Sequence, residues 1–342
     1  MPTIPRAKTL DKVLVTGAAG YVGCVLVPQL LDAGYEVVAY DIMYYGSEGL
    51  TPRAGLTIVR GDIRDDKAVR QALKGCDAVI HLACISNDPS FELDPALGKS
   101  INFDCFEPLV KASKEAGAKR FIYASSSSVY GVSEAAEVDE THPLKPLTDY
   151  SRFKALCEPL LLKHQAPGFC ATIIRPATVC GYSGRTRLDL SVNILTNLAV
   201  NNRRITVFGG SQKRPNIHID DIAELYIRLL ELPEALIAGE TFNAGYQNHT
   251  IAELAELVRR VVEAELPEKA PIEIVTSPTD DLRSYHVGSK RIAEKLGFSP
   301  RRTVEDAVRD LCRAFKAGKL PDSLTDPRYF NVKTMKAASA AV

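Results

Sequence analysis

Short apolar runs alternate with helical patterns along the first half of this chain, and glycines follow the first run directly. Val13-Leu-Val-Thr-Gly17 leads into Gly17-Ala-Ala-Gly20-Tyr-Val-Gly23. Gly17 permits a tight turn, Gly20 lets backbone amides approach a pyrophosphate, and Gly23 permits close packing of the next helix. The loop therefore predicts a strand, a turn and a helix N-terminus that together bind a dinucleotide.

Six runs in this region are brief, rich in β-forming residues and bounded by Gly, Asp or Ser, as buried parallel strands are. We expect strands at Lys12–Thr16, Glu36–Tyr40, Thr57–Arg60, Ala78–Leu82, Arg120–Ala124 and Cys170–Arg175. Helical patterns lie between them, including Tyr21–Ala33, Asp104–Ala116 and Ser151–His164. Repeated strand–helix units predict an α/β fold, a Rossmann doubly wound parallel sheet.

The pattern changes after Gly181, where a polar, basic loop at 183–189 precedes a helix near 190–200. This region predicts a smaller, interleaved α/β substrate-binding lobe over the strand ends. The expected helix Asp220–Leu232 and strand Thr241–Asn243 return to the main sheet. The expected division is 10–180 with about 215–245 for the dinucleotide-binding domain, 181–214 and 246–320 for the substrate-binding lobe, and 321–342 for a C-terminal tail. The last dozen residues show little pattern, and we expect them to be frayed.

Composition excludes several classes of protein. The 342 residues are 46% hydrophobic, and lysine plus arginine equals aspartate plus glutamate at 42 each, so no charge excess indicates nucleic acid or an anionic membrane. The eight cysteines form no Cys-x-x-Cys pair, which favours reduced thiols over a disulfide framework and predicts no metal site. Without a secretory signal or a membrane-spanning apolar run, we expect a cytoplasmic protein.

Tyr150 and Lys154, in Tyr150-Ser-Arg-Phe-Lys154, are four residues apart and share one face of a predicted helix. A free phenol titrates near pH ~10, and a nearby ammonium favours the phenolate, so we expect the pKa of Tyr150 to fall towards neutrality. A tyrosine with such a pKa exchanges a proton with a sugar hydroxyl. The spacing alone also occurs on solvated helix faces, but the glycine loop favours the catalytic interpretation.

Asp41 ends the second predicted strand, where a carboxylate accepts hydrogen bonds from an adenosine ribose and repels a 2′-phosphate. Ile42 and Met43 follow and provide no arginine for that phosphate, so the sequence favours NAD over NADP. Asp62 and Ile63, after the third strand, are expected to face adenine. In His81-Leu-Ala-Cys84 the backbone is expected to pass the cofactor, with His81 itself packed in the core.

These motifs are followed by the serine run Ala124-Ser-Ser-Ser-Ser-Val129-Tyr130-Gly131. From about Lys12 to Phe315 the chain resembles the extended short-chain dehydrogenases/reductases, and within them the nucleotide-sugar epimerase/dehydratase group of the UDP-galactose 4-epimerase type. The resemblance implies that Ser126 hydrogen-bonds the reacting sugar oxygen, Tyr150 is the acid/base, and Lys154 binds the nicotinamide ribose. The residues expected to bind NAD are Gly17, Ala19, Gly20, Tyr21, Val22, Asp41, Ile42, Asp62, Ile63, Leu82, Ala83, Cys84, Asn102, Ala124, Tyr150, Lys154 and Pro176.

Two departures from the family pattern bear on the reaction. Sugar 4,6-dehydratases of this group carry Asp-Glu where this chain has Ser127 and Ser128, and neither hydroxyl replaces a carboxylic acid near its working pKa. A dehydratase is therefore disfavoured. The family's usual Asn is replaced in Arg175-Pro-Ala-Thr178, which leaves the local sugar contacts open.

Arginines of the second lobe are the expected ligands of a nucleotide diphosphate, because a guanidinium donates two hydrogen bonds in a fixed fork. The run from Arg185 to Asn193 also resembles bacterial enzymes that oxidise a GDP-linked heptose at C4. The residues expected to bind the nucleotide-diphosphate sugar are Ser86, Asn87, Ser127, Thr178, Arg185, Arg187, Asn193, Arg214 and Arg283. His218 is expected to pack structurally.

Three functions are compatible with these motifs. The first is an NAD-dependent nucleotide-sugar epimerase that acts by transient hydride abstraction at C4 of a hexose or heptose. The second is a net 4-dehydrogenase or 4-ketoreductase with the same Ser-Tyr-Lys site. The third is a non-enzymatic dinucleotide sensor, which is disfavoured because such proteins commonly lose the tyrosine or lysine that this chain keeps. The resemblance also implies a homodimer.

Overall fold

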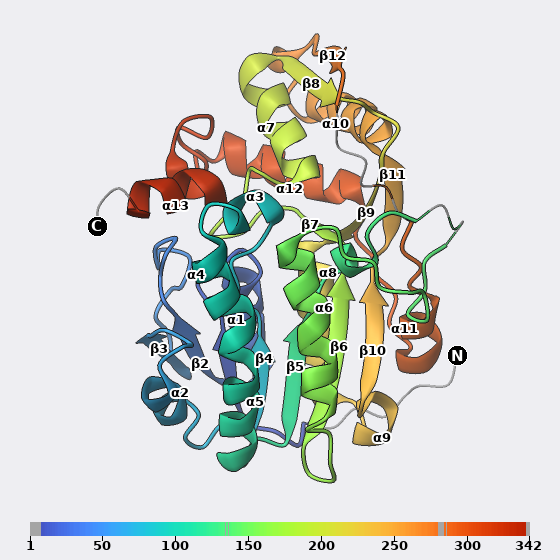
Figure 1. Cartoon of the computed structure of the whole chain (residues 1–342). Coiled ribbons are helices and arrows are strands. Elements are labelled where there is room, and N and C mark those ends of the chain that lie inside the picture. The colour runs from blue at the N-terminus through green and yellow to red at the C-terminus, as the bar shows by residue number, and fades with distance from the viewer. Residues whose placement is uncertain (1–7, 134, 136, 280–283, 285, 340–342) are drawn as a thin grey trace.

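The computed structural model describes residues 8–133, 135, 137–279, 284 and 286–339. Its centre is a seven-stranded sheet in the order β10-β6-β5-β4-β1-β2-β3, with every neighbouring pair parallel (Figure 1). The strands are β1 Lys12–Thr16, β2 Glu36–Asp41, β3 Leu56–Arg60, β4 Ala78–His81, β5 Arg120–Ala124, β6 Cys170–Pro176 and β10 Glu240–Ala244. All six strands predicted from the apolar runs form, and the expected segment near 241–243 supplies the seventh.

Helices cover both faces of this sheet, each over its own apolar core. On one face lie α1 (Gly23–Asp32) and α8 (Ile219–Glu231), packed against each other and the sheet. On the other face lie α2 (Asp66–Ala72), α5 (Phe106–Glu115) and α6 (Asp149–Leu162). A sheet buried on both faces needs strands that are apolar almost throughout, which is why the runs were recognisable. The predicted Rossmann α/β fold is confirmed.

A second lobe lies beyond the carboxyl ends of the strands of the main sheet (Figure 1). Three helices pack there around a separate apolar core, next to a pair of parallel strands, and a further three-stranded sheet includes the strand that leads into α8. Its elements are β7 Thr178–Cys180, α7 Ser191–Asn202, β8 Arg204–Phe208, β9 Lys213–His218, β11 Gln247–Thr250, α10 Ile251–Glu265, β12 Glu273–Ser277 and α12 Val304–Lys316. The predicted division into two functional domains stays a prediction.

Short elements connect these parts. They are α3 Asp88–Phe91, α4 Pro95–Lys99, the π-helix η1 Ser100–Asp104, the 3₁₀ helix η2 Ser127–Tyr130, α9 Glu234–Ile237, η3 Pro267–Lys269, α11 Lys290–Leu296 and η4 Pro327–Tyr329. Two of them, η2 and α3, follow β5 and the loop after β4, so they lie at the edge of the sheet where parallel strands end.

The C-terminal segment is helical, with α13 spanning Asn331–Ser339, so the expectation of a frayed tail is wrong for these residues. Tyr329, just before the helix, packs with Leu188 and Leu311 of the second lobe. Met335, on the helix, packs into a core of the main sheet. Most helical stability in proteins comes from such tertiary packing and not from intrinsic propensity, so a weak sequence pattern did not prevent the helix.

A buried ion pair joins β6 to α6. Arg175 and Glu158 are 6% and 4% exposed, and two bonds of 3.0 and 2.6 Å connect the guanidinium to the carboxylate. The Ser125 hydroxyl donates to the same carboxylate at 2.6 Å. On the other side, Arg175 donates to the Tyr130 hydroxyl, which donates in turn to Asn243 on β10. This network fixes the end of β5 relative to α6.

Replacing Gly17 by alanine should lower the free energy of unfolding by more than the cost of a positive φ at that residue alone. Gly17 has φ +75°, and a Cβ there would lie 2.6 Å from the backbone nitrogen of Ala83. Gly75 has a similar φ of +73° but nothing within 4 Å of its Cβ position. We expect Gly75→Ala to cost about 1–2 kcal/mol in urea unfolding, the usual cost of the left-handed conformation. Gly17→Ala should lower the free energy of unfolding clearly more. Equal losses in the two variants would contradict a close approach of the residue 17 Cβ to the backbone of Ala83.

Replacing Glu158 by glutamine should remove about 3–5 kcal/mol from the free energy of unfolding, because the Arg175 guanidinium is then left buried without its charge partner. The matched control is Glu256→Gln, which breaks an exposed pair with Arg259 on α10. We expect the control to change the urea midpoint little, because exposed ion pairs contribute little to stability. If both variants lost a similar free energy of unfolding, the buried pair would contribute no more to stability than the exposed pair.

Candidate active site

A cavity of about 510 Å³ lies at the carboxyl ends of the central strands, and residues of the second lobe line it too. It combines the glycine loop, the ends of β2 and β4, the serine run and the first turns of α6. The predicted site residues that line it are Gly17, Gly20, Tyr21, Val22, Asp41, Ile42, Asp62, Ile63, Leu82, Ala83, Cys84, Ser86, Asn87, Ala124, Ser126, Ser127, Tyr150, Lys154, Pro176, Thr178, Arg185, Arg187 and Arg214.

Three predicted ligands, Ala19, Asn102 and Asn193, lie outside this lining, and each has polar atoms bonded within the protein. The Ala19 amide donates to Asp41 at 3.0 Å. The Asn102 side chain makes two bonds of 2.8 and 2.9 Å to the backbone of Ile85 and holds the loop after β4. The Asn193 side chain bonds the backbone of Gly181 and Arg187, shaping the basic loop. In this structure these groups bond within the protein, and their direct contacts with a cofactor or substrate stay predictions. Arg283 lies outside the described residues.

The glycine loop is closed by its own backbone. The Gly17 amide donates to the Tyr40 carbonyl at 2.9 Å, and a Cβ on Gly23 would lie 2.4 Å from the Ala18 carbonyl oxygen. The chain therefore turns tightly, and α1 starts at Gly23 with no acidic residue in its first turn. The positive end of this helix is thus available to a phosphate group, so the loop fits a dinucleotide.

Asp41 stands at the end of β2 with both carboxylate oxygens anchored. They accept hydrogen bonds from the amides of Met43 at 2.7 Å and Ala19 at 3.0 Å. Burial raises the pKa of Asp41, although these amides and the Arg185 guanidinium oppose the rise. Each oxygen keeps a lone pair, so the carboxylate fits ribose hydroxyl groups. Asp62, after β3, lines the cavity with its carboxylate held by Arg64, whose hydrogen bonds lower the pKa of Asp62.

The first turns of α6 carry Tyr150 and Lys154 into the cavity. Thr148 caps the helix, and a capping box with Ser151 fixes where it begins. The Lys154 ammonium is buried, donates to the Ala124 carbonyl at 2.6 Å, and lies 5.1 Å from the centre of the Tyr123 ring. The helix therefore begins at a defined residue and presents both side chains to the end of β5.

The predicted fall in the pKa of Tyr150 is wrong for this structure. Burial raises the pKa well above the ordinary value for a phenol, and the neighbouring Cys84 and Asp88 raise it further. Arg187 and a hydrogen bond with Ser126 lower it, but by less. The Lys154 ammonium instead bonds to the Ala124 carbonyl. The sequence spacing predicted that both side chains reach one site, but it carries no information on the partial burial of the phenol or on its neighbours Cys84 and Asp88.

Ser126 lies between β5 and η2 as the N-cap of that short helix. Its hydroxyl oxygen accepts from the Ser128 amide at 3.1 Å and lies 2.9 Å from the Ser128 hydroxyl. The cap holds the Ser126 hydroxyl at the cavity, where its hydrogen bond with Tyr150 lowers the pKa of the phenol. A hydroxyl fixed beside a phenol is suited to orienting a substrate alcohol.

Two arginines of the basic loop reach the cavity in a compact cluster. Arg187 forms an ion pair with Asp189, its Nε to Oδ1 distance being 2.9 Å, and donates to the Ser86 hydroxyl at 3.2 Å. Arg185 stacks on the Tyr45 ring with its guanidinium carbon 4.0 Å from the ring centre. Burial and the charge of Arg187 lower the pKa of Arg185 to about 10. Both side chains are suited to binding an anion.

Several cavity residues were missed by the sequence analysis. Tyr44 and Tyr45 follow β2, three and four residues after Asp41, and this closeness was a usable signal. Asp189 belongs to the basic loop but was read only as part of a resemblance. Asn331 and Met335 come from α13, whose sequence carries no pattern that indicates a site. The remaining cavity residues outside the predicted set include Gly61, Ile85, Asp88, Pro89, Ile101, Ser125, Ser128, Ala177, Val179, Leu190, Ser191, Ile222 and Tyr226.

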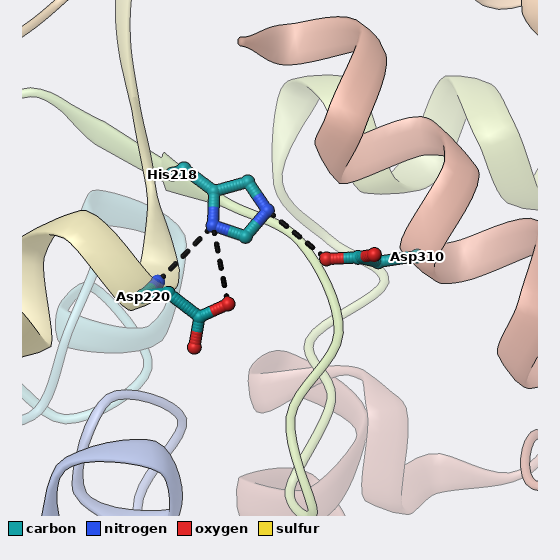
Figure 2. Close-up of side chains that lie close together, drawn as sticks. All are labelled: His218, Asp220 and Asp310. Atoms are coloured by element: carbon teal, nitrogen blue, oxygen red, sulfur yellow. Dashed lines mark hydrogen bonds and ion pairs between the residues drawn. The ribbon is translucent and has the colours of Figure 1, made fainter. Parts of the chain in front are cut away.

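His81 and His218 make contacts within the protein, which agrees with the structural roles predicted for them. His218 lies between Asp220 and Asp310, which approach opposite sides of its ring (Figure 2). Its Nδ1 accepts from the Asp220 amide at 3.1 Å, so Nε2 carries the proton and donates to Asp310 at 3.1 Å. The ring thereby joins α8 to α12 of the second lobe. His81 is buried on the Tyr123 ring, and burial lowers its pKa to about 3.

Known proteins are similar to this chain over most of its length. A family model described as the NAD dependent epimerase/dehydratase family matches residues 13–245. UDP-glucose 4-epimerase of Streptomyces lividans is 30% identical over 310 residues, covering 85% of this chain and 92% of the relative. The dTDP-glucose 4,6-dehydratase of Streptomyces griseus is 30% identical over 307 residues, covering 86% of this chain and 91% of the relative.

Among solved structures, UDP-glucose 4-epimerase of Thermus thermophilus in complex with NAD superposes with a TM-score of 0.75 at 26% identity, covering 89% of this chain and 99% of that one. Within the described part of the chain, no helix has both the length and the apolar composition that a membrane crossing needs. The family match spans more than half of the residues, so the chain belongs to the NAD-dependent epimerase/dehydratase family, enzymes of nucleotide sugars that use NAD as cofactor.

Proposed function

We propose that this enzyme is an NAD-dependent nucleotide-sugar 4-epimerase acting on a hexose or heptose. The observation that carries the proposal is the meeting of Ser126, Tyr150 and Lys154 at one cavity with the glycine loop. Relatives of equal identity include an epimerase and a dehydratase, so individual positions decide between them. Ser127 and Ser128 occupy the positions where dehydratases of this group carry acids, which supports the epimerase.

The chemistry of the site follows from its own groups. NAD, when bound, supplies a reversible hydride acceptor. Tyr150 takes the proton of the sugar C4 hydroxyl and later returns it. Its raised pKa suits the return of the proton, while Arg187 and the Ser126 hydroxyl favour the phenolate that removes it. Ser126 orients the reacting oxygen, and epimerisation requires that the 4-keto sugar turn within the cavity before a hydride is restored to C4 and the proton to its oxygen.

The substrate's diphosphate is assigned to arginines of the second lobe. Arg185 and Arg187 are buried at the cavity, and Arg214 lines it from β9. Guanidinium groups bind phosphate oxygens in pairs, so this set suits a nucleotide-diphosphate sugar. Screening UDP-, GDP-, CDP- and dTDP-sugars, with the product identified by NMR, tests the assignment. A cytoplasmic homodimer remains our expectation for the assembled enzyme.

The second candidate is a net 4-dehydrogenase or 4-ketoreductase, favoured by the resemblance of the run Arg185–Asn193 to GDP-heptose 4-dehydrogenases. Both reactions use the same residues, and the redox balance separates them. For an epimerase we expect the sugar to be converted with no net rise in the absorbance of reduced nicotinamide. Stoichiometric release of NADH, or a requirement for a second keto compound, would instead establish the dehydrogenase.

Tyr150→Phe should lower kcat by about 10²- to 10⁴-fold, the usual contribution of a general acid or base, with NAD affinity nearly unchanged. The matched control is Tyr35→Phe, which removes a buried hydroxyl that has no hydrogen-bond partner among the described residues, away from the cavity lining. We expect the control to keep full activity. Substantial turnover in Tyr150→Phe, measured with the sugar found in the screen, would remove the proposed acid/base role.

A further inference from the structure

The C-terminal helix closes one side of the cavity. Asn331, the first residue of α13, is 1% exposed, and Met335 follows one turn later. Both line the cavity, although they lie far along the chain from every other lining residue. Because α13 is packed against α3 and against the main core, its position relative to the cavity is fixed by contacts with the body of the protein.

Asn331 uses its backbone and both ends of its side chain to join two loops of the cavity. Its Oδ1 accepts from Arg185 at 2.5 Å, and its backbone amide donates to Asp189 at 3.0 Å. Its Nδ2 donates to the hydroxyl and the carbonyl of Ser86, at 3.0 and 3.3 Å. The loop after β4 and the basic loop of the second lobe are therefore held together by one residue from the C-terminal segment.

These bonds determine whether the Ser86 hydroxyl acts as a hydrogen-bond donor or as an acceptor towards the cavity. Its oxygen accepts from Asn331 Nδ2 at 3.0 Å and from Arg187 Nη1 at 3.2 Å. A hydroxyl has two acceptor lone pairs and one hydrogen to donate, so both lone pairs are occupied. Among the described residues none accepts that hydrogen, and Ser86 lines the cavity. Ser86 is thus left as a donor at the cavity wall.

The neighbouring side chains of Arg185 and Arg187 also have hydrogen-bond donors that no described residue uses. Asp189 pairs with Arg187, whereas Arg185 makes no ion pair with any carboxylate of the described residues. Arg185 Nε and Arg187 Nη2 are buried and lack a hydrogen-bond partner in the described part of the chain. The cluster therefore has unused donors but no matching acceptor, and buried donors of this kind are costly until they are paired. The side chains of Ser86, Arg185 and Arg187 thus line the cavity with positive charge and donor groups, which suits an anion, whose oxygens only accept.

We propose that Asn331 is a positioning residue that holds Ser86, Arg185 and Arg187 as one donor set for anionic oxygens of the substrate's diphosphate. The inference rests on the proposed function, because it takes the nucleotide-diphosphate sugar as the ligand of this cavity. It adds a contribution of the C-terminal segment to substrate affinity. Asn331 acts through the three side chains that it orders and not through contact with the reacting carbon.

The test is calorimetric titration of the NAD-loaded enzyme with UDP, dTDP, GDP and CDP, and with the corresponding nucleosides. Asn331→Ala should weaken the best-bound diphosphate at least about 10-fold, because a charge-assisted bond to Arg185 and the ordering of Ser86 are lost. Affinity for NAD and for the nucleoside should stay within about 2-fold. With the sugar nucleotide, KM should rise more than kcat falls.

Thr334→Ala is the matched control, because Thr334 lies on the same helix, bonds only the Pro327 carbonyl through its side chain, and is outside the cavity lining. It should leave diphosphate affinity unchanged. Asn331→Asp provides a second variant of the same size that still accepts from Arg185. We expect it to bind the diphosphate more weakly than Asn331→Ala, since its carboxylate places a like charge beside the phosphate oxygens.

The possible outcomes separate the two proposals. If the wild-type enzyme binds none of the four diphosphates, the proposed function fails and this inference fails with it. If the wild-type enzyme binds one of them and Asn331→Ala and Asn331→Asp bind it equally well, only the role of Asn331 is overturned. The role of Asn331 would also be overturned if the variants lost equal affinity for the diphosphate and for its nucleoside. Equal losses indicate a general loosening of the cavity and not the loss of phosphate contacts.

Discussion

The ion pair between Arg175 and Glu158 is the interaction on which the geometry of the active site depends. It lies where β6 meets α6, away from water, so each charge needs the other to remain buried. Glu158 is one turn after Lys154 on the same helix, and Ser125, which bonds it, directly precedes Ser126. The charge pair therefore fixes the helix that carries the phenol against the strand that carries the serine.

Electrostatics around the phenol are arranged differently from what a tyrosine and a lysine one turn apart suggest. The ammonium of Lys154 bonds a backbone carbonyl at the end of β5, and Arg187 of the second lobe is one of the groups that favour the phenolate. The pKa of Tyr150 thus depends on where the second lobe places Arg187. Under the proposed function one side chain therefore has two roles, because Arg187 favours the phenolate and also belongs to the arginines assigned to the diphosphate.

The parts of the fold that sequence predicts are those encoded by neighbouring residues. Buried parallel strands such as Val13–Thr16 have to be apolar on both faces, so they appear as runs, and the glycines at 17 and 23 stand where a side chain has no room. Asn102 and Asn193 were predicted to contact the cofactor and the substrate, and in the structure their side chains bond the backbone of nearby loops. A sequence does not state whether a side-chain amide faces a cavity or a loop. Asn331 was missed because its partners lie at positions 86, 185 and 189, and only the folded chain brings them together.

Having α13 at the cavity gives this enzyme an order of assembly. A ribosome completes all seven strands of the main sheet, and with them the glycine loop and the serine run, before residue 331 is synthesised. The residues of the glycine loop and the serine run are therefore synthesised before Asn331 and Met335, which line the same cavity. Proteolytic removal of α13 from Asn331 onward would take away the two side chains that it contributes to the cavity and leave the glycine loop and the serine run in the chain.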